Sequence, residues 1–336
     1  MPDIFFEDLQ IGAVRSFGAV PVRRGDMVAF AREFDPQPFH LDEAAAAAAP
    51  PGRLIASGWY SCAILMRLFC DAWLLRAASL GGPGVEEVRW LRPVAAGDVL
   101  SLRQRILDTR VSRSRPEMGL ATLESELLDA AGTPVLRMRH IGMFGRHDGG
   151  GAPPSPVPAT AGAARAAPER LDRLPEPEDP ALAPRWLDDI EIGRRVDLGT
   201  YHFGRERCID FARDYDPQLF HLEDEAAAAG PFGRLAASGW HTGAAWMNRF
   251  VARLDRIAAA GGRPRTSVSP GLRDLQWLKP VFAGDTIRFT TEPAETRPLA
   301  SRPGWGLVTS RNAGWNEAGD KVFAFTGMAL WQMRAG

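Results

Sequence analysis

The chain has 336 residues, which is enough for two ordinary domains that each bury a core. Hydrophobic residues make up 45% of it, charged residues make up 24%, and the formal net charge is −1. This balance is typical of a soluble globular protein and gives no sign of a nucleic-acid or membrane-surface partner. Cys62, Cys70 and Cys208 show no CxxC spacing, which argues against a disulfide framework or a structural zinc site.

The N-terminal segment, residues 1–12, carries acidic residues early and lacks the basic stretch and apolar run of a secretory signal. No stretch approaches the roughly 18 consecutive apolar residues that a membrane-spanning helix needs. We therefore expect a cytoplasmic protein without a targeting segment or a membrane partner.

The first elements are a strand over residues 14–22 and a short helix over residues 26–34, in which apolar residues recur at helical spacing. Asp35-Pro36 ends this helix, because the residue before a proline disfavours the α region. The prolines that follow predict an irregular loop for residues 35–40, rather than a helix or a strand. Asp42 can then cap a short alanine-rich helix that ends at residues 50–52.

A long apolar helix is predicted from Ser57 to about Ala78, and its composition is typical of a helix buried inside a fold. Strands follow over residues 85–94, 99–107, 120–128 and 134–144, and turn signals separate them. One long buried helix and a run of antiparallel strands predict an α+β unit, in which a curved sheet wraps around the helix.

The second half of the chain repeats the first. Residues 30–41, Phe-Ala-Arg-Glu-Phe-Asp-Pro-Gln-Pro-Phe-His-Leu, return as residues 211–222 at a spacing of 181. Trp90-Leu-Arg-Pro-Val returns at residues 277–281 at a spacing of 187, so a short insertion near residues 261–269 separates the copies. The segment 148–184 is rich in Ala, Pro and Gly and reads as a linker. We predict two domains of one fold, residues 1–147 and 185–336.

Each copy places an aspartate five residues before a histidine, as Asp35 and His40 and again as Asp216 and His221. A rigid loop can hold a carboxylate and an imidazole against one water molecule. One group then takes the water's proton, and the other delivers or relays a proton to the neighbouring carbon, as addition of water to a polarised double bond requires. Taken alone, each residue is also consistent with a turn aspartate or a core histidine.

Ser57-Gly58 opens the long helix of the first copy, and Ser238-Gly239 opens that of the second. A helix N-terminus offers free N–H groups and the positive end of the helix dipole, which would polarise a thioester carbonyl in the manner of an oxyanion hole. Glycine there lets a ligand approach the backbone closely. The alternative is a helix cap with tight packing.

No metal site is predicted from the remaining histidines, which are scattered through the chain. They are His140, His147, His202 and His241.

Residues 34–43, Phe-Asp-Pro-Gln-Pro-Phe-His-Leu-Asp-Glu, and then Arg53-Leu-Ile-Ala-Ser-Gly-Trp59 closely resemble MaoC-like acyl dehydratases, a family that includes R-specific enoyl-CoA hydratases. Similar blocks are residues 90–94, 97–98 and 112–116, so the resemblance covers nearly all of each copy. It implies a double hot-dog fold, in which the two copies pair side by side as an internal pseudo-dimer. Further association of chains into a homo-oligomer stays open.

The resemblance assigns the catalytic roles to Asp35 and His40, and again to Asp216 and His221. The implied reaction is reversible hydration of a trans-2-enoyl thioester to a 3-hydroxyacyl thioester, usually of R configuration, without a cofactor. The substrate partner would be an acyl-CoA or an acyl carrier protein thioester. Five arginines could meet CoA phosphates and are equally consistent with solvated surface: Arg53, Arg113, Arg115, Arg234 and Arg302.

The chain departs from the family pattern at several positions, which bear on the acyl chain accepted and on the hydration geometry. Ser-Gly replaces the His-Gly that often opens the long helix. The other departures are Phe34 and Tyr215 in place of Gly, Gln37 and Gln218 in place of Asn, and Ala63 and Ala244 where some members carry a serine that supports the aspartate.

Two other classes of function remain open, a hot-dog thioesterase and a non-catalytic protein that binds acyl thioesters. The copies differ near the expected sites, at the pairs Pro38 and Leu219, Tyr60 and His241, Leu65 and Trp246, and Arg67 and Asn248. Our hypothesis from the sequence is two competent sites of unequal substrate range, with Trp246 shortening one acyl pocket.

Overall fold

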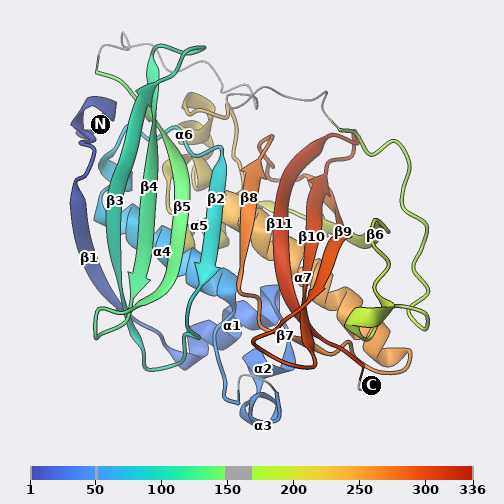
Figure 1. Ribbon diagram of the computed structural model, residues 1–336. Coiled ribbons are helices and arrows are strands. Elements are labelled where there is room, and N and C mark those ends of the chain that lie inside the picture. Colours follow the sequence, from blue (N-terminus) through green and yellow to red (C-terminus); the bar gives the residue numbers. More distant parts are fainter. Residues whose placement is uncertain (1, 50–51, 148–168, 335–336) are drawn as a thin grey trace.

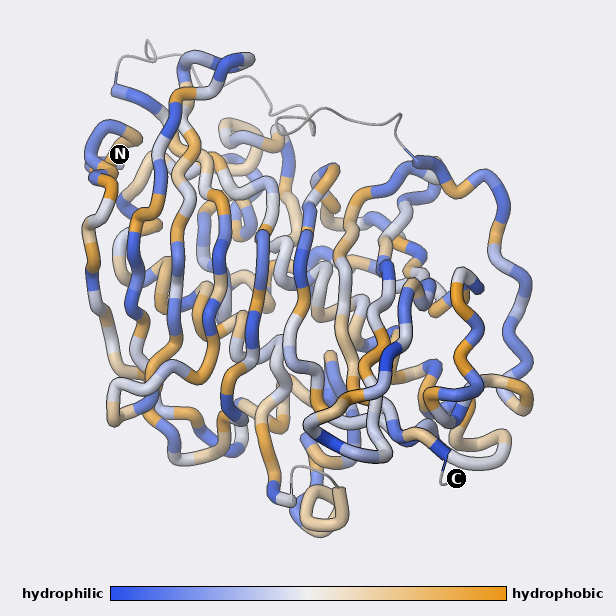
Figure 2. The backbone as a smooth tube through the Cα atoms, viewed as in Figure 1, coloured by the Kyte–Doolittle hydropathy of each residue, from blue (hydrophilic) through white to orange (hydrophobic). Residues whose placement is uncertain are grey.

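The computed structural model describes residues 2–49, 52–147 and 169–334. A single antiparallel sheet of eleven strands crosses the described part of the molecule, and two long helices, α4 (Gly58–Ala72) and α7 (Gly239–Ala259), pack against one of its faces (Figure 1). Buried residues alternate with more exposed ones along strands such as β3 (Val99–Val111). Figure 2 shows hydrophobic and hydrophilic residues alternating along the strands. The core therefore lies between the sheet and the two helices.

The N-terminal half follows the predicted order of elements. It contains β1 (Val14–Pro21), α1 (Arg24–Phe34), α2 (Pro38–Leu41), α3 (Glu43–Ala47), α4, β2 (Gly84–Trp90), β3, β4 (Met118–Leu128) and β5 (Pro134–Gly145). Its strands lie in the order β1-β3-β4-β5-β2. Helix α4 ends before the predicted Ala78, because Trp73 leaves helical geometry and its indole N–H donates to Gln104 on β3 at 2.9 Å.

The C-terminal half repeats this plan. It contains β6 (Val196–His202), α5 (Arg205–Tyr215), α6 (Asp224–Ala229), α7, β7 (Thr266–Ser267), β8 (Gly271–Trp277), β9 (Thr286–Pro298), β10 (Trp305–Trp315) and β11 (Lys321–Gln332). Its main strands lie in the order β8-β11-β10-β9-β6. The predicted insertion at residues 261–269 supplies β7, a short strand that pairs with β11.

Strands β2 and β8 join the two halves edge to edge, with Val85 opposite Leu275 and Val88 opposite Leu272. The helices also cross the boundary, since Arg67 of α4 donates to the carbonyl of Arg213 at 2.9 Å. The matching residue of α7, Asn248, donates to the carbonyl of Glu33 at 2.6 Å. The predicted α+β pseudo-dimer is therefore confirmed, with the sheets of the two halves joined edge to edge into one and a long helix packed on each half.

The prediction of an irregular loop over residues 35–40 is wrong in part. Helix α2 begins at Pro38 and contains His40, and the second copy forms a 3-10 turn over Leu219–His221. Proline is favoured at the first position of a helix, because its fixed φ is already helical and its missing N–H would have no partner there. The proline at position 38 therefore starts a helical turn in the first copy rather than preventing one.

The segment predicted as a linker is only partly described, since residues 148–168 lie outside the described ranges. Residues 169–184 contain no helix or strand and lie along the C-terminal half. There Leu171 N–H donates to the carbonyl of Gly319, and Glu178 pairs with Arg253 of α7 at 2.6 Å. Among the helices that the structure describes, none has the length and apolar character needed to cross a membrane.

Candidate functional site

Asp35 lies at the C-terminal end of α1, and its buried side chain is held by three neighbours. Ser57 Oγ donates to Oδ2 at 2.6 Å, and Gln37 Nε2 donates to Oδ1 at 2.9 Å. His40 Nε2 lies 3.3 Å from Oδ2. The predicted pair of Asp35 and His40 is therefore in direct contact and shielded from solvent.

The His40 ring is fixed by its other nitrogen, because Nδ1 lies 2.8 Å from the carbonyl oxygen of Ile55. A carbonyl oxygen only accepts hydrogen bonds, so Nδ1 carries a proton. Nε2 is then the nitrogen that exchanges protons, and it is the one that faces Asp35.

Burial alone would raise the pKa of the Asp35 carboxyl group, but its partners reverse the effect. The nearby His40 imidazole and the hydrogen bonds from His40, Ser57 and Gln37 hold the pKa below its ordinary value. Asp35 is therefore ionised at neutral pH and can accept a proton.

The second copy repeats these contacts around Asp216. Ser238 Oγ donates to Oδ2 at 2.7 Å and Gln218 Nε2 donates to Oδ1 at 2.9 Å, while His221 Nε2 lies 3.5 Å from Oδ2. His221 Nδ1 lies 2.7 Å from the carbonyl oxygen of Ala236. The duplicated sequence thus yields two buried aspartate–histidine pairs of the same geometry.

Ser57 and Ser238 cap the long helices and also contact the aspartates. Ser57 Oγ accepts from the Trp59 N–H at 3.2 Å while it donates to Asp35. Ser238 does the same with Trp240 and Asp216. The hydroxyl that supports each aspartate therefore comes from the N-cap residue of a long helix.

Gly58 and Gly239 leave room for tryptophan side chains. A Cβ on Gly58 would lie 2.6 Å from Cε2 of Trp90, whose indole N–H donates to the Gly58 carbonyl at 3.0 Å. A Cβ on Gly239 would lie 2.4 Å from Cε2 of Trp277. Tight packing is therefore one role of both glycines, in addition to the predicted access of a ligand to the helix N-terminus.

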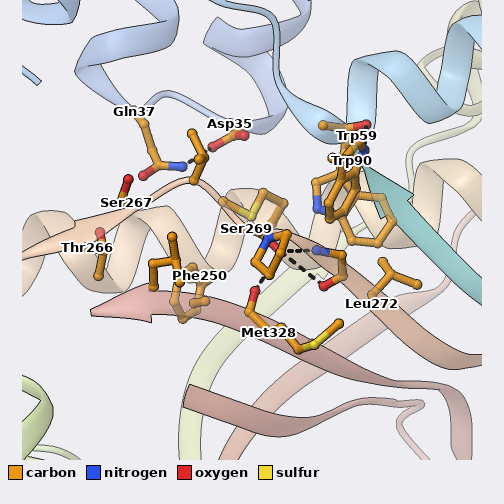
Figure 3. Close-up of a pocket in the computed structure, with 18 of the residues that line it drawn as sticks. Asp35, Gln37, Trp59, Trp90, Phe250, Thr266, Ser267, Ser269, Leu272 and Met328 are labelled. Carbon is orange, nitrogen blue, oxygen red and sulfur yellow. Dashed lines mark hydrogen bonds between the residues drawn. The ribbon is translucent and has the colours of Figure 1, made fainter. Parts of the chain in front are cut away.

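A cavity of about 380 Å³ opens on the first pair. The N-terminal half contributes Asp35, Gln37, His40, Gly58 and Trp59 to its wall, and Figure 3 shows the side chains that surround it. The opposite wall comes from the C-terminal half. It includes Trp246, Phe250, Ser267, Thr291, Asn312, Phe325 and Gly327.

Polar groups line part of the far wall, where Thr291 Oγ1 donates to Asn312 Oδ1 at 2.8 Å. None of the five arginines considered from the sequence lines the cavity, whereas Arg92 does. Arg92 also pairs with Asp129 at 2.8 Å. Sequence reasoning missed Arg92, although it lies in the Trp-Leu-Arg-Pro block, which the second copy repeats with Lys279 in place of the arginine.

Comparisons with known proteins show the family to which the chain belongs. The model of the MaoC-like domain matches residues 8–126 and 189–303, one match in each half. The chain belongs to the MaoC-like dehydratase family. A relative named mesaconyl-CoA hydratase, from Haloarcula marismortui, is 26% identical over 265 residues, which cover 74% of this chain and 68% of the relative. The mesaconyl-CoA hydratase of Cereibacter sphaeroides is 26% identical over 235 residues, or 68% of this chain and 64% of that protein.

Solved structures share the whole architecture of this chain. A MaoC domain protein from Chloroflexus aurantiacus superposes with a TM-score of 0.79 over 99% of both chains, at 18% identity. A Mycobacterium tuberculosis protein described as having a double hot-dog fold superposes with a TM-score of 0.72 at 19% identity, over 97% of this chain and 98% of that one. The predicted double hot-dog fold is confirmed.

Proposed function

We propose that this protein reversibly hydrates an enoyl-CoA thioester to a 3-hydroxyacyl-CoA thioester at Asp35 and His40. The observation that carries the proposal is the cavity, which leads from the surface to a buried, ionised aspartate in contact with a histidine. The family match and the relatives named mesaconyl-CoA hydratases support the same class of reaction.

The proposed chemistry uses the two residues as base and acid. The Asp35 carboxylate accepts a proton from water while the water oxygen bonds to C3 of the enoyl group. The electron pair of the C2–C3 double bond moves toward the thioester carbonyl. His40, protonated at Nε2, then gives a proton to C2, and a proton returns from Asp35 to His40 across the 3.3 Å contact. One water molecule is consumed and the thioester stays intact.

The developing enolate requires hydrogen-bond donors. We assign this role to the first turn of α4 at Gly58, since N–H groups there have no acceptor within the helix and lie at the positive end of its dipole. Gly58 and Trp59 both line the cavity beside Asp35. A thioester carbonyl at this position would be polarised as in an oxyanion hole.

The cavity also supports a proposal for the substrate. Trp246 and Phe250, stacked with ring centroids 5.2 Å apart, stand in the wall opposite the catalytic pair. We therefore propose a short or branched enoyl group, and mesaconyl-CoA belongs among the substrates to be tested because of the relatives' activity.

The test follows loss of the enoyl-thioester absorbance with crotonyl-CoA, mesaconyl-CoA and a longer straight-chain enoyl-CoA. Free thiol is measured in parallel, because a thioesterase releases it and a hydratase does not. We expect hydration without thiol release, and a loss of about 100-fold or more in kcat for His40→Ala. Thermal protection by acyl-CoA without turnover of any substrate would instead favour the binding protein.

A further inference from the structure

The two halves differ at many matched positions. One of these positions lies in the wall that faces the catalytic pair of the other half. His140 on β5 lies opposite Leu123 on β4, and Gly327 on β11 lies opposite Ser310 on β10. The strands on the other side give the same match, because β2 pairs with β5 at His140 in the same register in which β8 pairs with β11 at Gly327. A histidine in one half therefore occupies the position that a glycine occupies in the other.

Gly327 keeps space open in front of Asp35 and His40. It lines the cavity, and a Cβ added to it would lie 2.8 Å from Asn312 Nδ2. Any side chain at this position would crowd the cavity wall, so the glycine is needed for the volume that an acyl group would occupy.

His140 fills the corresponding space in the N-terminal half. Its side chain is 9% exposed, packs edge-on against Phe69 with ring centroids 5.6 Å apart, and lies with Nε2 2.9 Å from Ser125 Oγ. Gln104 donates to Ser125 at 2.9 Å and accepts from the Trp73 indole at 2.9 Å. These hydrogen bonds connect the four polar side chains into one buried network.

In the repeat, Gln104, Ser125 and His140 correspond to Thr291, Asn312 and Gly327, which line the cavity at the first pair. The N-terminal half contacts Asp216 through Cys70, whose Sγ lies 3.6 Å from Oδ1. It also contacts Gln218, the neighbour of Asp216, through Ser79, whose Oγ donates at 2.7 Å. Phe69, which packs on His140, is the residue before Cys70 on α4. The acyl group of a substrate at Asp216 would therefore have to enter the region that His140 fills.

We infer that hydration takes place at only one of the two pairs, with His140 closing the acyl space at Asp216 and His221 and Gly327 keeping it open at Asp35 and His40. This inference rests on the proposed function. It differs from the hypothesis of two competent sites drawn from the sequence, because the second pair would keep its hydrogen bonds without the space for an acyl chain.

The first arm of the test is Asp35→Asn, which keeps the shape of the side chain but removes the carboxylate. One working site predicts a loss of at least about 100-fold in kcat for crotonyl-CoA, the usual contribution of an acid–base group. Two working sites would leave a large share of the wild-type activity. Retention of more than about a tenth of it would overturn the inference.

The second arm adds His140→Gly to Asp35→Asn. If His140→Gly opens the second acyl space, kcat should recover by at least about tenfold. A further Asp216→Asn substitution should remove this recovery. His140→Ala replaces the glycine variant if thermal unfolding shows that the latter does not fold. A folded double variant without recovery would overturn the role of His140. Wild-type protein that hydrates no enoyl-CoA would count against the proposed function itself.

Discussion

Ser57 Oγ donates a 2.6 Å hydrogen bond to Asp35 Oδ2, and this contact links the N-terminus of the long helix to the segment that follows α1. The same hydroxyl accepts from the Trp59 N–H, so its proton is directed to the carboxylate. One side chain thus caps α4 and stabilises the ionised form of Asp35.

We predict that Ser57→Ala raises the pKa of Asp35 and lowers activity. The change removes one of the hydrogen bonds that hold this pKa down, while burial continues to raise it. The acidic limb of the profile of kcat/KM against pH should move to higher pH, with a loss of about tenfold or more at neutral pH. Ser57→Thr, which keeps the hydroxyl, should recover the profile. An unchanged acidic limb in Ser57→Ala would show that the hydroxyl does not act on Asp35.

Gly58→Ala should destabilise the protein, because its Cβ would overlap the Trp90 ring. Overpacking of this kind costs about 1–3 kcal/mol, measurable by urea unfolding. Gly25→Ala is the matched control, since Gly25 lies in α1 with nothing within 4 Å of its Cβ position. That change should stabilise the protein by up to about 1 kcal/mol. Equal effects of the two substitutions would contradict the packing role of Gly58.

Stability should fall as the pH drops from 6.5 toward 4. Burial lowers the pKa of His140 to about 4, so the unfolded chain binds more protons than the folded protein in this range. The contribution is fully present above pH 6.5 and is on the order of 2 kcal/mol smaller at pH 4.5. Burial lowers the pKa of His241 to about 3 and adds a loss of the same sign. Urea unfolding of His140→Gln should show a shallower decline, and an identical decline would contradict a buried, neutral His140.

Glu178→Ala should be strongly destabilising, although Glu178 lies in the segment predicted as a linker. Its partner Arg253 is 6% exposed, and loss of the carboxylate leaves a buried charge unpaired, at a cost of about 3–5 kcal/mol. Glu176→Ala is the control, because the pair of Arg173 and Glu176 is nearly fully exposed and should contribute little. If the two substitutions change the urea midpoint equally, residues 169–184 do not stabilise the C-terminal half in this way.

Much of the fold was predictable because the chain repeats itself and its strands alternate clearly. The end of α4 was not, since it depends on the contact of Trp73 with Gln104, which are distant in sequence. The turn at Pro38 was missed because proline both ends and starts helices, and only the tertiary context decides between them.

The residues of the candidate site were predictable from the sequence, but the cavity around them was not. The spacing of Asp35 and His40 brought attention to both, and the structure places them 3.3 Å apart. The residues of the opposite cavity wall could not be predicted. The edge-to-edge pairing of β2 and β8 decides which half of the chain faces which aspartate–histidine pair. His140 was set aside as one of four scattered histidines. The sequence signal that could have identified it is that the second copy carries Gly327 at the position that His140 occupies in the first.

The most direct test of hydration at Asp35 is the mass of the product formed from crotonyl-CoA. Wild-type protein should add the mass of one water and leave the thioester intact, and in water labelled with heavy oxygen the label should appear in the acyl group. Asp35→Asn, shown by thermal unfolding to be folded, should form this product at least about 100-fold more slowly. Free CoA as the product, or hydration at an undiminished rate in Asp35→Asn, would contradict the proposed site and reaction.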